Sequence, residues 1–108
     1  MLIKQAPSLH VARYVPNTCV LGKSHLYVFG GFGKLAPLNT IEVLNAAAVI
    51  ADPENPTNQW ELIEPKTGPV PGPRTNAIFT PISSTEIVII GGFCSDYKTD
   101  SYIFDTEA

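Results

Sequence analysis

Two short apolar runs, each followed by a glycine pair and a phenylalanine, dominate the hydrophobic pattern of the chain. Residues 26–32 read LYVFGGF and residues 87–93 read IVIIGGF. The runs lie 61 residues apart, and the same spacing separates Arg13 from Arg74. Self-similarity at one fixed spacing indicates a repeat architecture.

Each apolar run predicts a strand that is buried on both faces, because it is short, continuous and bounded by turn residues. The pairs Gly30-Gly31 and Gly91-Gly92 at its end predict either a positive φ or another backbone passing close by. A unit whose central strand is buried on both sides needs neighbours on both sides.

The pattern around the runs predicts up to four short strands per unit. The first unit is expected to form strands at residues 14–21, 25–29, 39–45 and 60–64, with a tight turn at 22–24. The second is expected to form strands at 76–82, 86–90 and 100–105, with a turn at 83–85 and a loop at 94–99. Residues 46–51 predict either a single helical turn or an extension of the third strand, and the turn-rich segment 52–58 predicts no regular element.

Four antiparallel strands joined in sequence order form a meander, which is one blade of a propeller. The chain resembles the kelch repeat in the order of its features: the glycine pair, a polar-led third strand (39–45 and 99–106), Trp60, and Pro-Gly-Pro before Arg74. The resemblance covers nearly the whole chain. It implies an all-β fold, a kelch-type β-propeller fragment of about two four-stranded antiparallel blades. Leu44 replaces the family's aromatic residue, and the connection 46–59 stretches the period beyond the usual ~50 residues.

On this interpretation residues 1–12 are the end of a preceding blade and a connector, because Leu2-Ile3 resembles Leu62-Ile63. Residues 13–64 form blade one, 65–73 a second connector, and 74–108 an incomplete blade two. Propellers typically close with four to eight blades. We therefore expect the chain to need further blades, either from a longer form of the same protein, which its end within a blade favours, or from self-association into a ring.

Composition excludes several classes of partner. Of 108 residues 44% are hydrophobic and 16% charged, the net charge is -3, and no cluster of Lys and Arg exists, which argues against a nucleic-acid partner. No apolar run approaches the ~20 residues that span a membrane, and residues 1–12 lack the pattern of a signal peptide. The two cysteines, Cys19 and Cys94, are expected to be free thiols in a reducing compartment, with a disulfide as the alternative. These features predict a cytoplasmic protein.

Four motifs could indicate chemistry: residues 22–24 as the tail of a phosphate-binding loop, 31–33 as a dinucleotide fingerprint, His10 and His25 as zinc ligands, and Asp96 with Asp100 as calcium ligands. The glycine motifs are not followed by the helix that phosphate binding requires. The histidines and aspartates lack the spacing of a metal site. No nucleophile with its base can be assembled, so no catalytic residue, metal or cofactor is expected.

The kelch resemblance implies a non-catalytic protein–protein interaction module that binds its partner through the loops of one face. Those loops are residues 7–12, 33–38, 65–73 and 94–99, because successive turns of a meander alternate between faces. The predicted contact side chains are Lys34, Leu35, Tyr97 and Lys98, with Tyr97 as an amphipathic anchor. The alternative is a portion of a catalytic, oxidase-like propeller whose active residues lie on blades not present here.

Five further positions are tied to the repeat. Arg13 and Arg74 contact a partner or, as we favour, satisfy loop carbonyls with their five donors. Trp60 is expected to pack in the core between blades. Tyr102 and Phe104 share one side of the third strand and should both pack.

Overall fold

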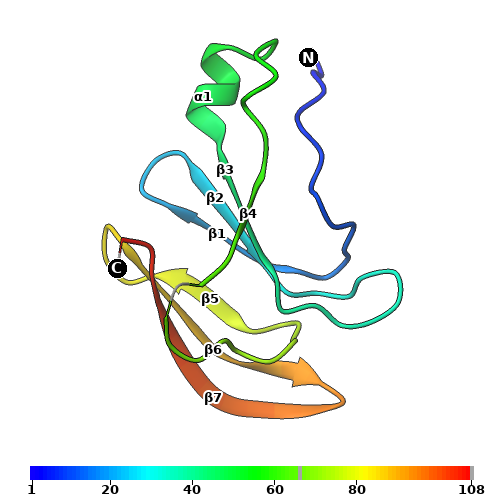
Figure 1. Ribbon diagram of the computed structural model, residues 1–108, viewed down its shortest axis with the longest axis vertical. Coiled ribbons are helices and arrows are strands. Elements are labelled where there is room, and N and C mark those ends of the chain that lie inside the picture. Colours follow the sequence, from blue (N-terminus) through cyan, green and yellow to red (C-terminus); the bar gives the residue numbers. More distant parts are fainter. Residues whose placement is uncertain (66, 108) are drawn as a thin grey trace.

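The computed structural model describes residues 1–65 and 67–107, which form two antiparallel sheets and one short helix (Figure 1). The first sheet contains β1 (Asn17–Leu21), β2 (His25–Phe29), β3 (Ile41–Asn45) and β4 (Glu61–Ile63), with the helix α1 (Ala46–Ala51) between β3 and β4. The second contains β5 (Ile78–Pro81), β6 (Glu86–Cys94) and β7 (Asp96–Asp105). Spatial order equals sequence order in both sheets, so each is a meander and the all-β fold is confirmed.

Most strand bounds differ from the prediction. β2 has the predicted bounds, but β1 begins at Asn17 and β5 at Ile78, later than expected. The residues before them take the left-handed conformation at the same repeat position, with φ 52° at Val15 and φ 55° at Asn76. A left-handed residue interrupts the extended backbone of a strand. The third and fourth strands of the first sheet are also shorter than predicted, and residues 46–51 form the helical alternative.

The predicted loop at residues 94–99 is wrong. β6 continues through Gly91 and Gly92 to Cys94, with a register shift at the glycine pair, and β7 begins at Asp96. Ser95, at φ 61°, alone reverses the chain. The repeat spacing falls from 61 residues at the glycine pair to 60 at the third strand, so residues 94–98 correspond to residues 33–38, which remain an open loop.

The structure leaves part of the domain division as a prediction. Residues 1–5 form no strand, and Leu2 and Ile3 are 79% and 81% exposed. Their assignment to a preceding blade stays a prediction. Residue 66 of the connector and residue 108 of blade two lie outside the described residues.

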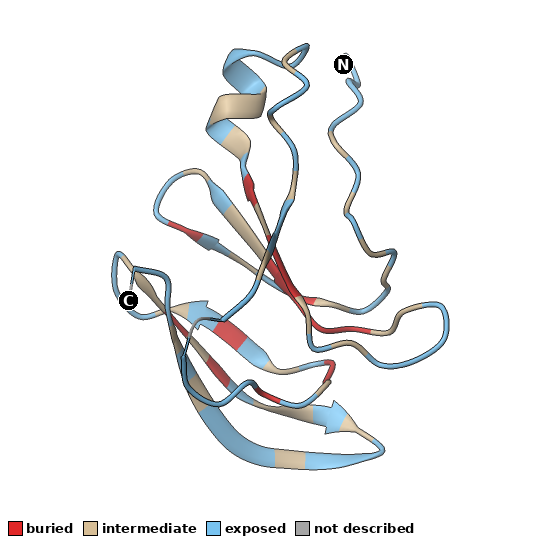
Figure 2. Cartoon of the chain, viewed as in Figure 1, coloured by how far each residue is buried: buried red, intermediate tan, exposed pale blue. Residues whose placement is uncertain are grey.

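The core lies between the two sheets, where the buried positions in Figure 2 concentrate. Its buried members are Leu21, Phe29, Ile41, Phe79, Ile87 and Ile89. Phe104 packs edge-on against Phe29 and Phe79, with ring centroids 5.5 and 5.6 Å apart, and Tyr102 also packs against this cluster. The predicted packing of Tyr102 and Phe104 is therefore confirmed.

Trp60 does not lie in this core, and its predicted packing between blades is wrong for the two sheets of this chain. The residue is half-buried, and its indole N–H donates to the carbonyl oxygen of Pro7 at 3.1 Å. The ring nitrogen Nε2 of His10 lies 2.6 Å from the carbonyl oxygen of Trp60. Trp60 thus holds the N-terminal segment against the outer edge of the first sheet.

Candidate functional site

Arg13 joins three chain segments at one end of the first sheet. Its Nη1 donates to the carbonyl oxygens of Gly30 and Thr40, both at 3.1 Å, and its Nε donates to that of Val11 at 3.3 Å. An ion pair with Glu42, with 2.7 Å between Nη2 and Oε2, completes the site, and both side chains are fully buried. Arg13 therefore fixes both ends of the loop between β2 and β3.

Arg74 makes the equivalent contacts in the second sheet. It donates to the carbonyl oxygens of Gly91 at 3.0 Å and Gly72 at 3.2 Å. Asp100 accepts from both terminal nitrogens of the guanidinium, at 2.6 and 3.0 Å. The guanidinium also lies 5.8 Å from the centroid of the Tyr102 ring, a cation–π geometry.

The carboxylate that pairs with the arginine occupies different positions in the two repeats. At a spacing of 60, Asp100 corresponds to Thr40, and Glu42 corresponds to Tyr102. Residues two apart on a strand share one face, so either position can reach the same guanidinium. The exposure differs sharply, because the Glu42 side chain is 0% exposed and that of Asp100 is 43% exposed.

The ion pairs have electrostatic consequences. The hydrogen bond from Arg74 lowers the pKa of Asp100 to about 2. The same hydrogen bond raises the pKa of Arg74 above its already high usual value. Both partners therefore stay charged across the physiological pH range.

Two roles were predicted for Arg13 and Arg74, partner contact and satisfaction of loop carbonyls. Their surroundings favour the second. The side chain of Arg13 is 0% exposed and that of Arg74 is 2% exposed, and each donates to carbonyl oxygens as well as to a carboxylate. Partner contact through these guanidinium groups would require them to leave buried ion pairs, which is costly.

The other four predicted contact residues lie on two hairpin tips. Leu35 is 96% exposed and Tyr97 is 82% exposed, Lys34 is exposed and Lys98 is half-buried. Tyr97 packs edge-on against Phe93, with centroids 5.3 Å apart. The β2–β3 loop and the β6–β7 turn both point toward the right of Figure 1, so the two tips lie on the same side of the molecule.

Hydrogen bonds from main-chain and side-chain amides fix the positions of the two tips relative to one another. The N–H of Gly31 donates to the carbonyl oxygen of Arg74 at 3.1 Å. Asn17, only 5% exposed, donates to the same carbonyl at 3.1 Å and accepts from the N–H of Ala77 at 2.8 Å. These bonds cross from one sheet to the other.

Sequence reasoning missed Asn17 and Glu42. Asn17 stands where the second repeat has Ile78, so a polar residue at an apolar repeat position was the available signal. Glu42 is an acidic residue within a β-favouring strand, which also calls for a partner because an unpaired buried charge is unfavourable.

The described residues offer little that resembles a reactive centre. No group of three or more His, Cys, Asp or Glu side chains converges among them. Cys19 and Cys94 are both free, and burial raises the pKa of the Cys19 thiol to about 11, which keeps it protonated. Within the part of the chain that the structure describes, no helix is long and apolar enough to cross a membrane.

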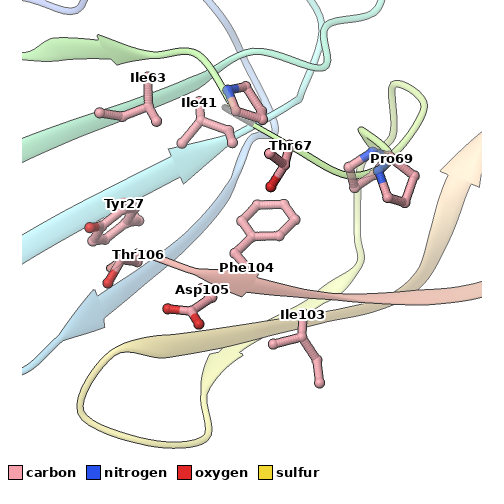
Figure 3. A pocket seen from close by; sticks show the side chains of 11 residues that line it. Tyr27, Ile41, Ile63, Thr67, Pro69, Ile103, Phe104, Asp105 and Thr106 are labelled. Atoms are coloured by element: carbon pink, nitrogen blue, oxygen red, sulfur yellow. The ribbon is translucent and has the colours of Figure 1, made fainter. Parts of the chain in front are cut away.

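A pocket of about 300 Å³ opens between the sheets, away from the hairpin tips (Figure 3). Tyr27, Ile41 and Ile63 line it from the first sheet, and Phe104 points into it from β7. The connector covers one side with Thr67 and three prolines. Among the described residues the lining is mostly apolar, and its ionisable side chains are Asp105 and Tyr27.

Comparison with known families gives one finding: the sequence model of the kelch motif matches residues 13–67. This segment runs from the first arginine through β4 and into the connector, and it makes up half of the chain. No curated protein matches the chain.

Proposed function

Because the chain belongs to the kelch-repeat family, we propose that it is a non-catalytic module that binds another protein through the loops of one face. We place it in the cytoplasm, where its two thiols stay reduced. Further blades come either from the same protein in a longer form or from self-association.

The observation that carries the proposal is the exposure of two large side chains on tips whose bases are bound by buried arginines. Leu35 and Tyr97 are 96% and 82% exposed, whereas the arginines at the base of each tip are enclosed. Exposed aromatic and aliphatic side chains on a fixed scaffold are typical of binding anchors. Lys34 and Lys98 beside them add positive charge, which favours a partner surface with acidic groups around an apolar centre.

The test compares partner capture by the wild-type chain with capture by a double variant, Leu35→Asp with Tyr97→Asp. Ile50→Asp is the matched control, because Ile50 is 81% exposed on α1, at the other end of the molecule. A protein captured by the wild type and the control, and lost with the double variant, is then purified. Its affinity for the double variant should fall by a factor of about 10 or more, since anchors contribute more than 1 kcal/mol each.

Equal affinity of the purified partner for the wild type and the double variant would contradict binding through this face. An equal loss of affinity in the Ile50→Asp control would also contradict binding through this face. Far-ultraviolet circular dichroism on all three proteins ensures that the comparison is made on folded chains.

A further inference from the structure

The outer edge of β7 lacks a strand neighbour among the described residues. The second sheet ends at β7, whereas β3, its repeat counterpart, pairs with β4 through Ile41–Ile63 and Glu42–Leu62. β7 is 10 residues long. An open edge of this length presents unpaired N–H and C=O groups to any strand of suitable sequence.

The pocket described above borders the C-terminal half of β7, at residues 103–105. Phe104 points into it, Ile103 points away on the other side of the strand, and Thr67 lies across from them (Figure 3). Its volume is about 300 Å³. An apolar cavity of roughly 150 Å³ is enough to hold a benzene molecule. The pocket therefore has room for an apolar side chain that reaches it from a strand paired with β7.

The chain contains a segment with the matching sequence. Leu2-Ile3 precedes Leu62-Ile63 of β4 by 60 residues, the spacing that also relates β3 to β7. Applied to the pairs Ile41–Ile63 and Glu42–Leu62, this spacing places Ile3 opposite Ser101 and Leu2 opposite Tyr102. Both apolar side chains are about four-fifths exposed in the structure.

In this register the opposed residues also match in charge and in the side of the sheet that they occupy. Lys4 falls opposite Asp100, whose carboxylate is 43% exposed although it is bound to Arg74. Opposite charges on directly opposed residues stabilise a strand pair. Residues that face each other across a pair share one side of the sheet, so Leu2 takes the side of Tyr102 and Phe104, toward the pocket.

The segment cannot reach β7 of its own chain. Figure 1 shows the N-terminus at one end of the molecule and β7 at the other, and Trp60 and Glu42 hold residues 7–11 against the first sheet. We therefore propose that residues 2–4 of a second copy of this chain add to the outer edge of β7 as an antiparallel strand, with Leu2 beside the pocket, on the side of the sheet where Phe104 lines it. The proposal rests on the self-association included in the proposed function, and it does not involve the residues of the loop face.

Disulfide trapping in the full chain tests the register. All proteins carry Cys19→Ala and Cys94→Ser. The test mixes a protein that carries Ile3→Cys with a second protein that carries Ser101→Cys. In the matched control the second protein carries Thr99→Cys instead. Thr99 and Ser101 are both exposed on one face of β7. We expect the mixed disulfide at residue 101 to form about tenfold faster than at residue 99, because a shift of two residues takes the Cα atoms beyond bridging distance.

Equal trapping rates at the two positions, or no mixed disulfide at residue 101, would overturn the proposal. Light scattering gives a second measurement without cysteines. Leu2→Asp should lower the fraction of oligomer at a given concentration, and Ile50→Asp on the exposed face of α1 should leave it unchanged. A monomeric wild-type chain, or an oligomer that Leu2→Asp does not affect, would show that the copies do not meet at β7. Either result would leave binding through Leu35 and Tyr97 untouched.

Discussion

Adding one methyl group at Gly31 tests how closely the chain segments pack at the end of β2. Gly31 has φ 86°, and a Cβ atom there would lie 2.7 Å from the carbonyl oxygen of Tyr14 and 3.0 Å from backbone atoms of Pro16. Gly22 is a matched control, because it has φ 64° but no atom within 4 Å of an added Cβ. Gly31→Ala and Gly22→Ala thus share the backbone strain and differ in the close approach.

The magnitudes follow from that difference. A left-handed conformation costs a non-glycine residue about 1–2 kcal/mol, and this is the expected loss for Gly22→Ala. In Gly31→Ala the Tyr14 segment must also move. That segment exchanges two hydrogen bonds with Phe32, at 2.9 and 3.0 Å, and Gly31 itself donates to Arg74 at 3.1 Å. Loss of two of these three bonds, at about 1 kcal/mol each, brings the expected cost of Gly31→Ala to about 3–4 kcal/mol.

Urea unfolding measures both variants, with Trp60 fluorescence and circular dichroism followed at one protein concentration, because association would shift the apparent stability. Gly31→Val should be at least as destabilising as Gly31→Ala. Gly92→Ala is a second instance, since its Cβ would lie 2.7 Å from the carbonyl oxygen of Thr75. If Gly31→Ala and Gly22→Ala lose the same free energy of unfolding, the close approach of the Tyr14 segment does not constrain the fold.

Three further predictions concern single features of the two blades. Val15→Asn should raise the free energy of unfolding by about 1 kcal/mol and Asn76→Val should lower it, because both sites are left-handed and asparagine tolerates that conformation better; urea midpoints moving the other way would refute this. The pKa of Asp100 is lowered to about 2 in the folded state, so its stabilising effect is present above the unfolded pKa and is lost as the pH falls toward 2. Urea midpoints between pH 5 and pH 2 should therefore fall less steeply in Asp100→Asn, and parallel curves would exclude this contribution. Replacing residues 47–53 with a short Gly-Ser turn should leave the β-sheet circular dichroism intact, because α1 contains no buried residue; loss of the signal would show that the helix supports the sheet.

Local sequence features predicted the centre of each blade well and its borders poorly. β2 and the conformations of Gly30 and Gly31 follow from residue type, since an apolar β-favouring run and a glycine pair leave few alternatives. The start of β1 does not follow, because valine at residue 15 favours extended backbone and yet takes φ 52°. Its repeat equivalent Asn76 takes the same conformation, so the tertiary fold, rather than the residue, sets the backbone there.

The two glycine pairs show how the neighbouring blade changes the outcome of one motif. The N–H of Gly31 donates to Arg74 of the next blade, and the chain then leaves the sheet as an open loop. Gly92 instead pairs with Lys98 of its own hairpin, and β6 continues to Cys94. The Gly-Gly-Phe motif is the same at both places, but residues 33–38 (GKLAPL) and 94–99 (CSDYKT) differ, so both the neighbouring blade and the residues after the motif distinguish the two places.

The arginine sites show why the carboxylate partner of each arginine could not be predicted by aligning the two repeats. The arginine recurs at a fixed spacing, but its carboxylate moves by two positions, from Glu42 in one blade to Asp100 in the other. The long arginine side chain with its forked end can reach either position. The ion pair is therefore present in both blades, although the two carboxylates do not occupy equivalent positions of the repeat. Burial then follows from the neighbours: the N–H groups of His10 and Val11 donate to Glu42, at 2.7 and 3.2 Å. The equivalent residues before Arg74 are Pro71, which has no N–H, and Gly72, and the carboxylate of Asp100 remains 43% exposed.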